Sequence, residues 1–345
     1  MLHSQMSLIN VLFGMLLGSL VVAGVTQWYV VAKKFFLLQA KHFDSLEMGR
    51  VSFHYLQRDL QSAGYRGCRT NDETFPVNHI YSPLNRKFQF FNFNQAVFGF
   101  IASPGACYGK MPDISCKRIK KNTPVLIIYN VPQKINRLVN DLKFAEDAIS
   151  LPHNHGIHEN SLVLINDCHH GDLFIANRVE TTKIYHNKII NVNESDALSR
   201  GYVNKNAVVV ELQTIAYYLG VPERYEKEHH KNLDIAQVNA ALFRDDLLQQ
   251  AQEIVSDVSD LMFEFGIKTS RDDKDKMSYR TLTQMREHDW PCVQLVRVTI
   301  VDTNKQRWIY EISLRNRCSA CSGVDLLARH FMVGHRVMCA DIFGI

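Results

Sequence analysis

Histidine and cysteine are the residues of this sequence whose types and spacing can do chemistry. His153, His155 and His158 lie close together, and His169 and His170 follow. Imidazoles at short spacing suit zinc or copper. Loop spacing of this kind is unspecific, however, and the sequence contains no His-Glu-x-x-His pattern of a catalytic zinc site. We therefore interpret these histidines as surface residues of loops and expect no metal or cofactor.

A second cluster near the end of the sequence comprises Cys318, Cys321, His330, His335 and Cys339. These side chains can form a zinc site or a redox pair. The stretch that carries them shows no clear pattern of secondary structure beyond "VDLLARHFMV". We interpret residues 318–345 as a cysteine-containing tail rather than as a designed site.

No pattern of nucleophilic or phosphate chemistry is present, since both Gly-x-Ser-x-Gly and a phosphate-binding glycine loop are missing. The pairs Arg58–Asp59 and Asp257–Asp260 are interpreted as solvated faces and turn residues. We therefore expect that the protein is not an enzyme. The net charge of +4 is spread along the 345 residues, so it predicts no direct binding to nucleic acid.

The first element of the chain is the uncharged run "MSLINVLFGMLLGSLVVAGVTQWYVV", which extends from Met6 to Val31. A helix needs about 20 apolar residues to cross a bilayer. A buried core helix of this length would show a polar face, and a cleavable signal would carry a basic start and a shorter apolar region. We therefore predict a retained, single-pass membrane helix over residues 6–32.

The same helix is predicted to continue as an amphipathic segment over residues 33–64. Apolar residues recur at three- and four-residue spacing, and Gly64 is a natural end of the helix. These apolar positions are Phe36, Ala40, Phe43, Leu46, Phe53, Leu56, Leu60 and Ala63. The first half is expected to pack among similar helices, and the second half on its own globular domain.

The remainder of the chain reads as mainly β. Runs bounded by Asn, Gly and Pro predict strands at Phe88–Phe93, Pro124–Tyr129, Ser161–Ile165, Ala207–Leu219, Cys292–Val301 and Gln306–Leu314. One helix is predicted near Ile235–Ile254, and the charged stretches Glu223–Lys231 and Ser270–Lys276 are predicted to be exposed connections.

Two signals disagree on the side of the membrane that holds the globular part. Lys33 and Lys34 follow the apolar run, which favours the cytoplasm. Eight cysteines favour disulfides in an oxidising compartment.

Several stretches resemble a known family. "MSLINVLFGMLLGSLVVAGV" resembles the start of a type IV pilin or pseudopilin, and "RVSFHYLQRDLQSAGYRGC" resembles the helix end of PilW-type minor pilins. "SLVLINDCHHGDLFIANRV", "IVSDVSDLMFEFGI", "VQLVRVTIVDT" and "EISLRNR" resemble later parts of the same family. The resemblance covers residues 6–317.

The resemblance implies an α+β, pilin-like fold, in which a long N-terminal helix packs on an antiparallel β-rich domain over residues 65–317. It further implies a single-pass inner-membrane protein whose domain is periplasmic and which is incorporated into the pilus. Its partners would be other minor pilins, the major pilin, the inner-membrane assembly platform and prepilin peptidase. The function would be to prime assembly in a tip complex and so to support adhesion, twitching motility or DNA uptake. The alternatives are a type II secretion pseudopilin and a membrane-anchored periplasmic metal-binding or sensing domain.

The sequence departs from the family at its start. A glycine precedes the leader-cleavage position in the family, whereas Gln5 precedes Met6 here, with residues 1–5 in the place of a short leader. The family's glutamate, which is understood to pair with the amino terminus of a neighbouring subunit, is replaced by Asn10. Asn10 can accept a hydrogen bond but cannot neutralise a charge.

The cysteines that match the family are interpreted as structural. Cys107 and Cys116 share a loop and are expected to form a local bridge, which leaves Cys68 to pair with Cys168 or Cys292. The sequence alone does not fix this connectivity.

Overall fold

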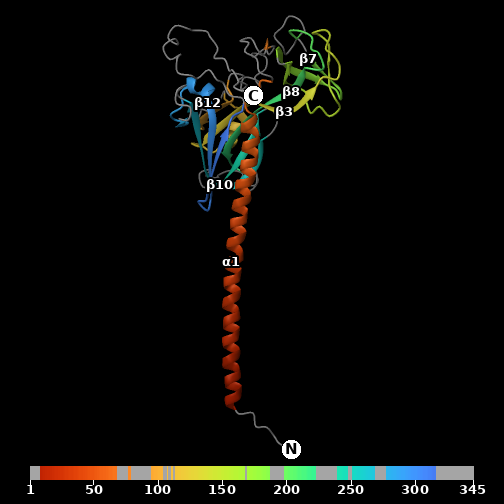
Figure 1. Cartoon of the computed structure of the whole chain (residues 1–345). Coiled ribbons are helices and arrows are strands. Elements are labelled where there is room, and N and C mark those ends of the chain that lie inside the picture. Colours follow the sequence, from red (N-terminus) through yellow and green to blue (C-terminus); the bar gives the residue numbers. More distant parts are fainter. Residues whose placement is uncertain are drawn as a thin grey trace, which may run out of the picture. The chain divides into compact units, whose positions relative to one another are not determined.

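The computed structural model describes residues 8–67, 77–78, 95–103, 107, 110–111, 113–167, 169–186, 198–222, 239–247, 251–268 and 277–315. The chain divides into two compact units, one up to Arg50 and one from Val51 onward, and each is described by itself. Helix α1 (Leu8–Ser62) forms the first unit, and its last turns, residues 51–62, belong to the second (Figure 1).

Helix α1 forms because its sequence offers no interruption. It contains no proline, and no acidic residue occurs before Asp44. Just after Ser62 the chain turns at Gly64, which has a φ of 70°. The Gly64 amide donates a hydrogen bond to the Tyr129 carbonyl at 2.8 Å, so the backbone leaves the helix to meet a strand. A glycine suits this turn because L side chains are strained at positive φ.

The second unit is dominated by one sheet, which has 13 strands in the part of the chain that the structure describes. The strands are β1 (Val77–Asn78), β2 (Val97–Ile101), β3 (Pro124–Arg137), β4 (Ile149–Ser150), β5 (Ser161–Asn166), β6 (Gly171–Val179), β7 (Lys183–His186), β8 (Val208–Gly220), β9 (Ala240–Asp246), β10 (Ala251–Lys268), β11 (Met277–Thr281), β12 (Val293–Asp302) and β13 (Arg307–Ser313). Two short helices accompany them, α2 (Asp113–Arg118) and the 3-10 helix η3 (Glu287–Cys292).

Most neighbours in the sheet are antiparallel, in the order β13-β12-β10-β9-β8-β5-β6-β7-β4, and β3 also pairs with β8. The short strand β1 runs parallel to β6. Strand β8 is buried along nearly its whole length, which means that both of its faces are covered. On one face Tyr218 stacks on Phe243, with ring centroids 5.7 Å apart. Tyr65, just after α1, packs against a separate cluster that includes Leu212.

The expected α+β fold class was wrong. The long N-terminal helix is present, but α2 and η3 are the only other helices within the described ranges, and each has six residues. The rest of the regular structure is a large antiparallel sheet. The protein is therefore more β-rich than the pilin-like arrangement that we inferred.

Part of this error lies in the helix that we predicted near Ile235–Ile254. Wherever the structure describes these residues in regular structure, they belong to strands β9 and β10. The successive residues Ala240, Ala241, Leu242 and Phe243 are all buried, so β9 is enclosed on both faces. An enclosed strand shows no two-residue alternation, and its continuous apolar run therefore passes for a helix.

Other predicted elements are confirmed. The strands expected at Pro124–Tyr129, Ser161–Ile165, Ala207–Leu219, Cys292–Val301 and Gln306–Leu314 correspond to β3, β5, β8, β12 and β13. The strand predicted at Phe88–Phe93 and the two predicted connections lie outside the described residues.

Candidate functional site

The surface of α1 over residues 11–31 is apolar and uncovered. Large hydrophobic side chains from Val11 to Leu46 are exposed, and none of the most apolar window is buried within the protein. The few hydroxyls are satisfied inside the helix, since Ser19 Oγ donates to Leu16 O at 2.8 Å and Thr26 Oγ1 to Val22 O at 2.7 Å. Hydroxyls bonded in this way are tolerated in lipid. By length and composition this helix can cross a membrane.

The residues predicted for leader cleavage and subunit pairing lie at the start of α1. Gln5 and Met6 are outside the described residues, and Asn10 lies in the first turns of the helix.

The end of α1 carries a buried acidic residue. Leu56, Leu60 and Ala63 are fully buried, and Asp59, on the same helical face, is only 1% exposed. Its carboxylate Oδ2 accepts hydrogen bonds from Arg244 Nε of β9 at 2.6 Å and from Tyr217 Oη of β8 at 2.8 Å. These three residues, which we call the Asp59 cluster, hold the last turns of α1 to two strands of the sheet.

Electrostatics in the Asp59 cluster favour a charged Arg244 and a protonated Tyr217. Burial alone would lower the pKa of Arg244, but the hydrogen bond and the charge of Asp59 outweigh it and raise that pKa above its ordinary value. Burial and then the charge of Asp59 raise the pKa of Tyr217 well above its usual range, so its phenol stays protonated as a donor. At the other oxygen, Arg58 Nε donates to Asp59 Oδ1 at 2.9 Å from a more exposed position.

Our interpretation of Asp59 as part of a solvated face was therefore wrong. The sequence held a signal that we did not use, because Asp59 follows Leu56 by three residues and precedes Ala63 by four. That spacing places it on the apolar stripe. An acidic residue at such a position requires a partner, although the sequence does not identify Arg244 and Tyr217 as that partner.

His155 performs a structural task. Its ring is buried, and Nε2 lies 3.0 Å from the Glu180 carbonyl while Nδ1 accepts the Ile157 amide at 3.1 Å. Because a carbonyl only accepts, the proton is assigned to Nε2 and the ring is neutral. Neither nitrogen offers a lone pair for a metal in this arrangement.

The other histidines have separate surroundings. His158 Nδ1 lies 3.2 Å from the buried carboxylate of Glu211 on β8, and His153 is exposed. The amides of His169 and His170 donate to Asp167 Oδ1 in the turn between β5 and β6. Within the described ranges, no three His, Cys, Asp or Glu residues form a group that could hold a metal ion.

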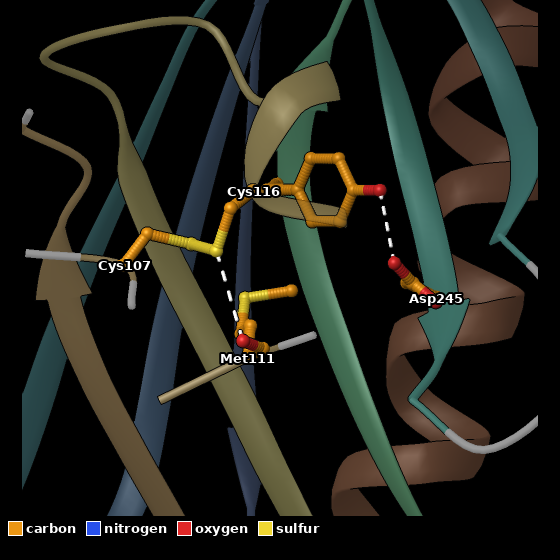
Figure 2. The surroundings of a disulfide bond; sticks show 5 residues. Cys107, Met111, Cys116 and Asp245 are labelled. Carbon is orange, nitrogen blue, oxygen red and sulfur yellow. Dashed lines mark hydrogen bonds between the residues drawn. A yellow bond between two sulfur atoms is a disulfide. The ribbon is translucent and has the colours of Figure 1, made fainter. Parts of the chain in front are cut away.

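Cys107 and Cys116 form a disulfide, with their Cα atoms 5.8 Å apart (Figure 2). They are the local pair expected from their shared loop. The bond belongs to a buried cluster that includes Met111. Figure 2 shows Met111 beside the bond and Asp245 on strand β9. Cys292 is also disulfide-bonded. The candidates Cys68 and Cys168 and the cysteines of the tail lie outside the described residues.

These features define a class of protein in which a β-sheet domain is preceded by one long helix that is apolar enough to cross a membrane. Residues 216–318 match the model of the family described as Type IV Pilus-assembly protein W. This match supports the PilW-type resemblance over that stretch and indicates involvement in type IV pilus assembly. No curated protein and no solved structure matches the chain.

The matched stretch contains two members of the Asp59 cluster. It begins within β8 and includes β9 through β13, so Tyr217 and Arg244 lie inside it and Asp59 lies before it. The cluster thus ties the end of the N-terminal helix to the family-matched part of the sheet.

Proposed function

We propose that this protein is a non-catalytic minor pilin that takes part in type IV pilus assembly as a member of the priming or tip complex. The observation that carries the proposal is a single helix that is apolar and uncovered at its start and fixed at its end to a PilW domain. A subunit that joins a filament through its first helix needs both properties. The chain would then support adhesion, twitching motility or DNA uptake.

The proposed location is the inner membrane, crossed once, with the sheet domain on the periplasmic side and the protein incorporated into the pilus. The Cys107–Cys116 disulfide supports this side, because disulfides persist in oxidising compartments. The proposed partners are other minor pilins, the major pilin, the inner-membrane assembly platform and prepilin peptidase. Their helices would contact the exposed apolar surface of α1.

A replacement of the membrane helix distinguishes a pilus subunit from a protein that uses this helix only as a membrane anchor. Residues 8–31 are exchanged for a leucine-alanine helix of equal length, which keeps the anchor and removes the natural surface. We expect the variant to remain in the membrane fraction and to lose pilus assembly, measured as major pilin sheared from the surface of host cells. The conservative variant Leu20→Ile serves as the matched control and should assemble normally. Normal piliation with the leucine-alanine helix would contradict the proposal.

Processing at Gln5–Met6 and pairing at Asn10 are proposed on the resemblance alone. Intact-mass measurement of the protein from membranes of its native host tests the first. A chain that starts at Met6 supports cleavage, whereas a retained Met1–Gln5 segment contradicts it. If Asn10 accepts a hydrogen bond from a neighbouring subunit, Asn10→Leu should reduce piliation and Asn10→Asp should not.

A further inference from the structure

Helix α1 changes character at Trp28. The residues before it, from Leu8 to Gln27, carry no charge. They number about 20 and extend for about 30 Å at 1.5 Å per residue, which is the thickness of the hydrocarbon core of a bilayer. Trp28 and Tyr29 come next, and they are 74% and 62% exposed. Because Trp and Tyr concentrate where hydrocarbon meets the lipid headgroups, these two residues mark one edge of the hydrocarbon core.

Two lysines follow the aromatic residues within two helical turns. Lys33 lies about 6 Å beyond Tyr29 along the helix axis, and Lys34 about 9 Å beyond Trp28, at 1.5 Å per residue. The headgroup region on each side of a bilayer is about 5–8 Å thick. Helical side chains lean toward the N-terminus of their helix, so both lysines lean back toward the edge of the hydrocarbon. Their ammonium groups therefore reach the level of the lipid phosphates.

The two ammonium groups are available to an anion. Both lysine side chains are exposed, and neither makes an ion pair with any residue that the structure describes. The first acidic residue of α1 is Asp44, which lies about 15 Å beyond Lys34 along the axis. No carboxylate of the helix is therefore close enough to neutralise the pair, and Lys33 and Lys34 present two adjacent positive charges to the headgroups.

A deeper position of the helix in the bilayer is unfavourable. Phe35 and Phe36 are 61% and 69% exposed and are apolar enough to enter hydrocarbon. Lys33 and Lys34 precede them in the helix, however, so any shift that submerges the two phenylalanines carries both lysines into the hydrocarbon as well. A charged side chain is costly there. The lysines thus hold the helix at the depth that Trp28 and Tyr29 mark.

We propose that residues 28–34 of α1 form a binding surface for anionic phospholipid headgroups, in which Lys33 and Lys34 bind the lipid phosphates. A zwitterionic headgroup binds less well, because it carries a positive charge beside its phosphate that the lysines repel. Each lysine near an anionic membrane surface should strengthen the preference up to about fivefold. The inference rests on the proposed crossing of the membrane by α1. It holds for either orientation of the chain, since lipid headgroups lie on both sides of a bilayer.

The test uses the full chain reconstituted in phosphatidylcholine vesicles. The vesicles contain either brominated phosphatidylglycerol or brominated phosphatidylcholine at the same low fraction, and bromine quenches the fluorescence of nearby tryptophan. The difference between the parent chain and Trp28→Phe isolates the signal of Trp28 from those of Trp290 and Trp308. We expect phosphatidylglycerol to be enriched around Trp28 at least about fivefold at low salt. The enrichment should fall in about 1 M salt, which screens exposed charges.

Three double variants assign the preference to the two lysines. Lys33→Gln with Lys34→Gln should remove it, so that both brominated lipids quench Trp28 equally. Lys33→Arg with Lys34→Arg keeps the charges and should keep the preference. The matched control is Lys120→Gln with Lys121→Gln, which removes the same charge from the turn before β3 and should also keep the preference.

Equal quenching of the parent chain by the two lipids, or an enrichment that survives Lys33→Gln with Lys34→Gln, would overturn the inference. Loss of the enrichment in inorganic phosphate, compared with chloride at equal ionic strength, would assign the lysines to a free phosphate and overturn the choice of lipid. Washing the vesicles with carbonate reads the anchoring separately. A chain that is retained but shows no lipid preference overturns this inference alone, whereas a chain that washes off overturns the anchoring and the inference together.

Discussion

Removing the carboxylate of the Asp59 cluster should destabilise the second unit strongly. In Asp59→Ala the guanidinium of Arg244, whose side chain is 12% exposed, loses its buried partner, and the Tyr217 phenol loses its acceptor. Breaking a buried ion pair by removing one partner costs about 3–5 kcal/mol. We therefore expect the free energy of unfolding to fall by about 4 kcal/mol, within that range for buried pairs.

The measurement is urea unfolding of the full chain in detergent, followed by tryptophan fluorescence. Arg58→Ala is the matched control, because the Arg58 side chain is 52% exposed and its pair with Asp59 should contribute less than about 1 kcal/mol. The double variant Asp59→Leu with Arg244→Met removes both charges together and should recover most of the loss. A cost below about 1 kcal/mol for Asp59→Ala would refute the reasoning, because a buried pair cannot be lost so cheaply. If the losses of unfolding free energy of Asp59→Ala and Arg244→Ala add up in the double variant, that would refute the reasoning as well.

Three further predictions follow from other contacts. The double variant Cys107→Ser with Cys116→Ser opens a loop of sequence separation 9 and should cost about 3 kcal/mol of unfolding free energy, and reductant should destabilise the parent chain by more than the variant. Burial, followed by the charge of Asp172, raises the pKa of Tyr202, so the folded chain favours the neutral phenol. The unfolding free energy should therefore be level below pH 10, which is about the tyrosine pKa in the unfolded chain, and should decrease as the pH rises above it. Normal titration of every tyrosine at about pH 10 in the folded chain would contradict this. His155→Ala leaves the Ile157 amide and the Glu180 carbonyl without their partner and should lower the free energy of unfolding by about 2–4 kcal/mol. The control His153→Ala should change it by less than about 0.5 kcal/mol. Added zinc should alter neither value.

Much of the fold could be predicted where the determining forces are local. The uncharged run that begins at Met6 specifies a helix and an apolar environment by itself, because both depend on composition along one segment. The strands β3, β5, β8, β12 and β13 were recognisable because apolar runs and turn residues bound them. The loop shared by Cys107 and Cys116 set their proximity before any tertiary contact.

The candidate site could be predicted only in part. The apolar surface of α1 was evident in the sequence, and the family resemblance over its later part is confirmed at residues 216–318. The expected fold class was wrong in part because both faces of β9 are buried, which erases the alternation that marks a strand. The histidine cluster looked like one group in the sequence, but His155 and His158 bond to different parts of the chain.

The sequence by itself determined that an apolar helix leads into a domain rich in strands, since these properties belong to single segments. Only the tertiary structure decided that Asp59 meets Arg244 and Tyr217, which are separated from it by 185 and 158 residues. Only the order of strands decided that, among the described strands, β13 pairs with β12 alone. The physical reason is the same in both cases: burial and hydrogen bonding satisfy a residue through partners that are distant in the chain, and no local pattern specifies which partners those are.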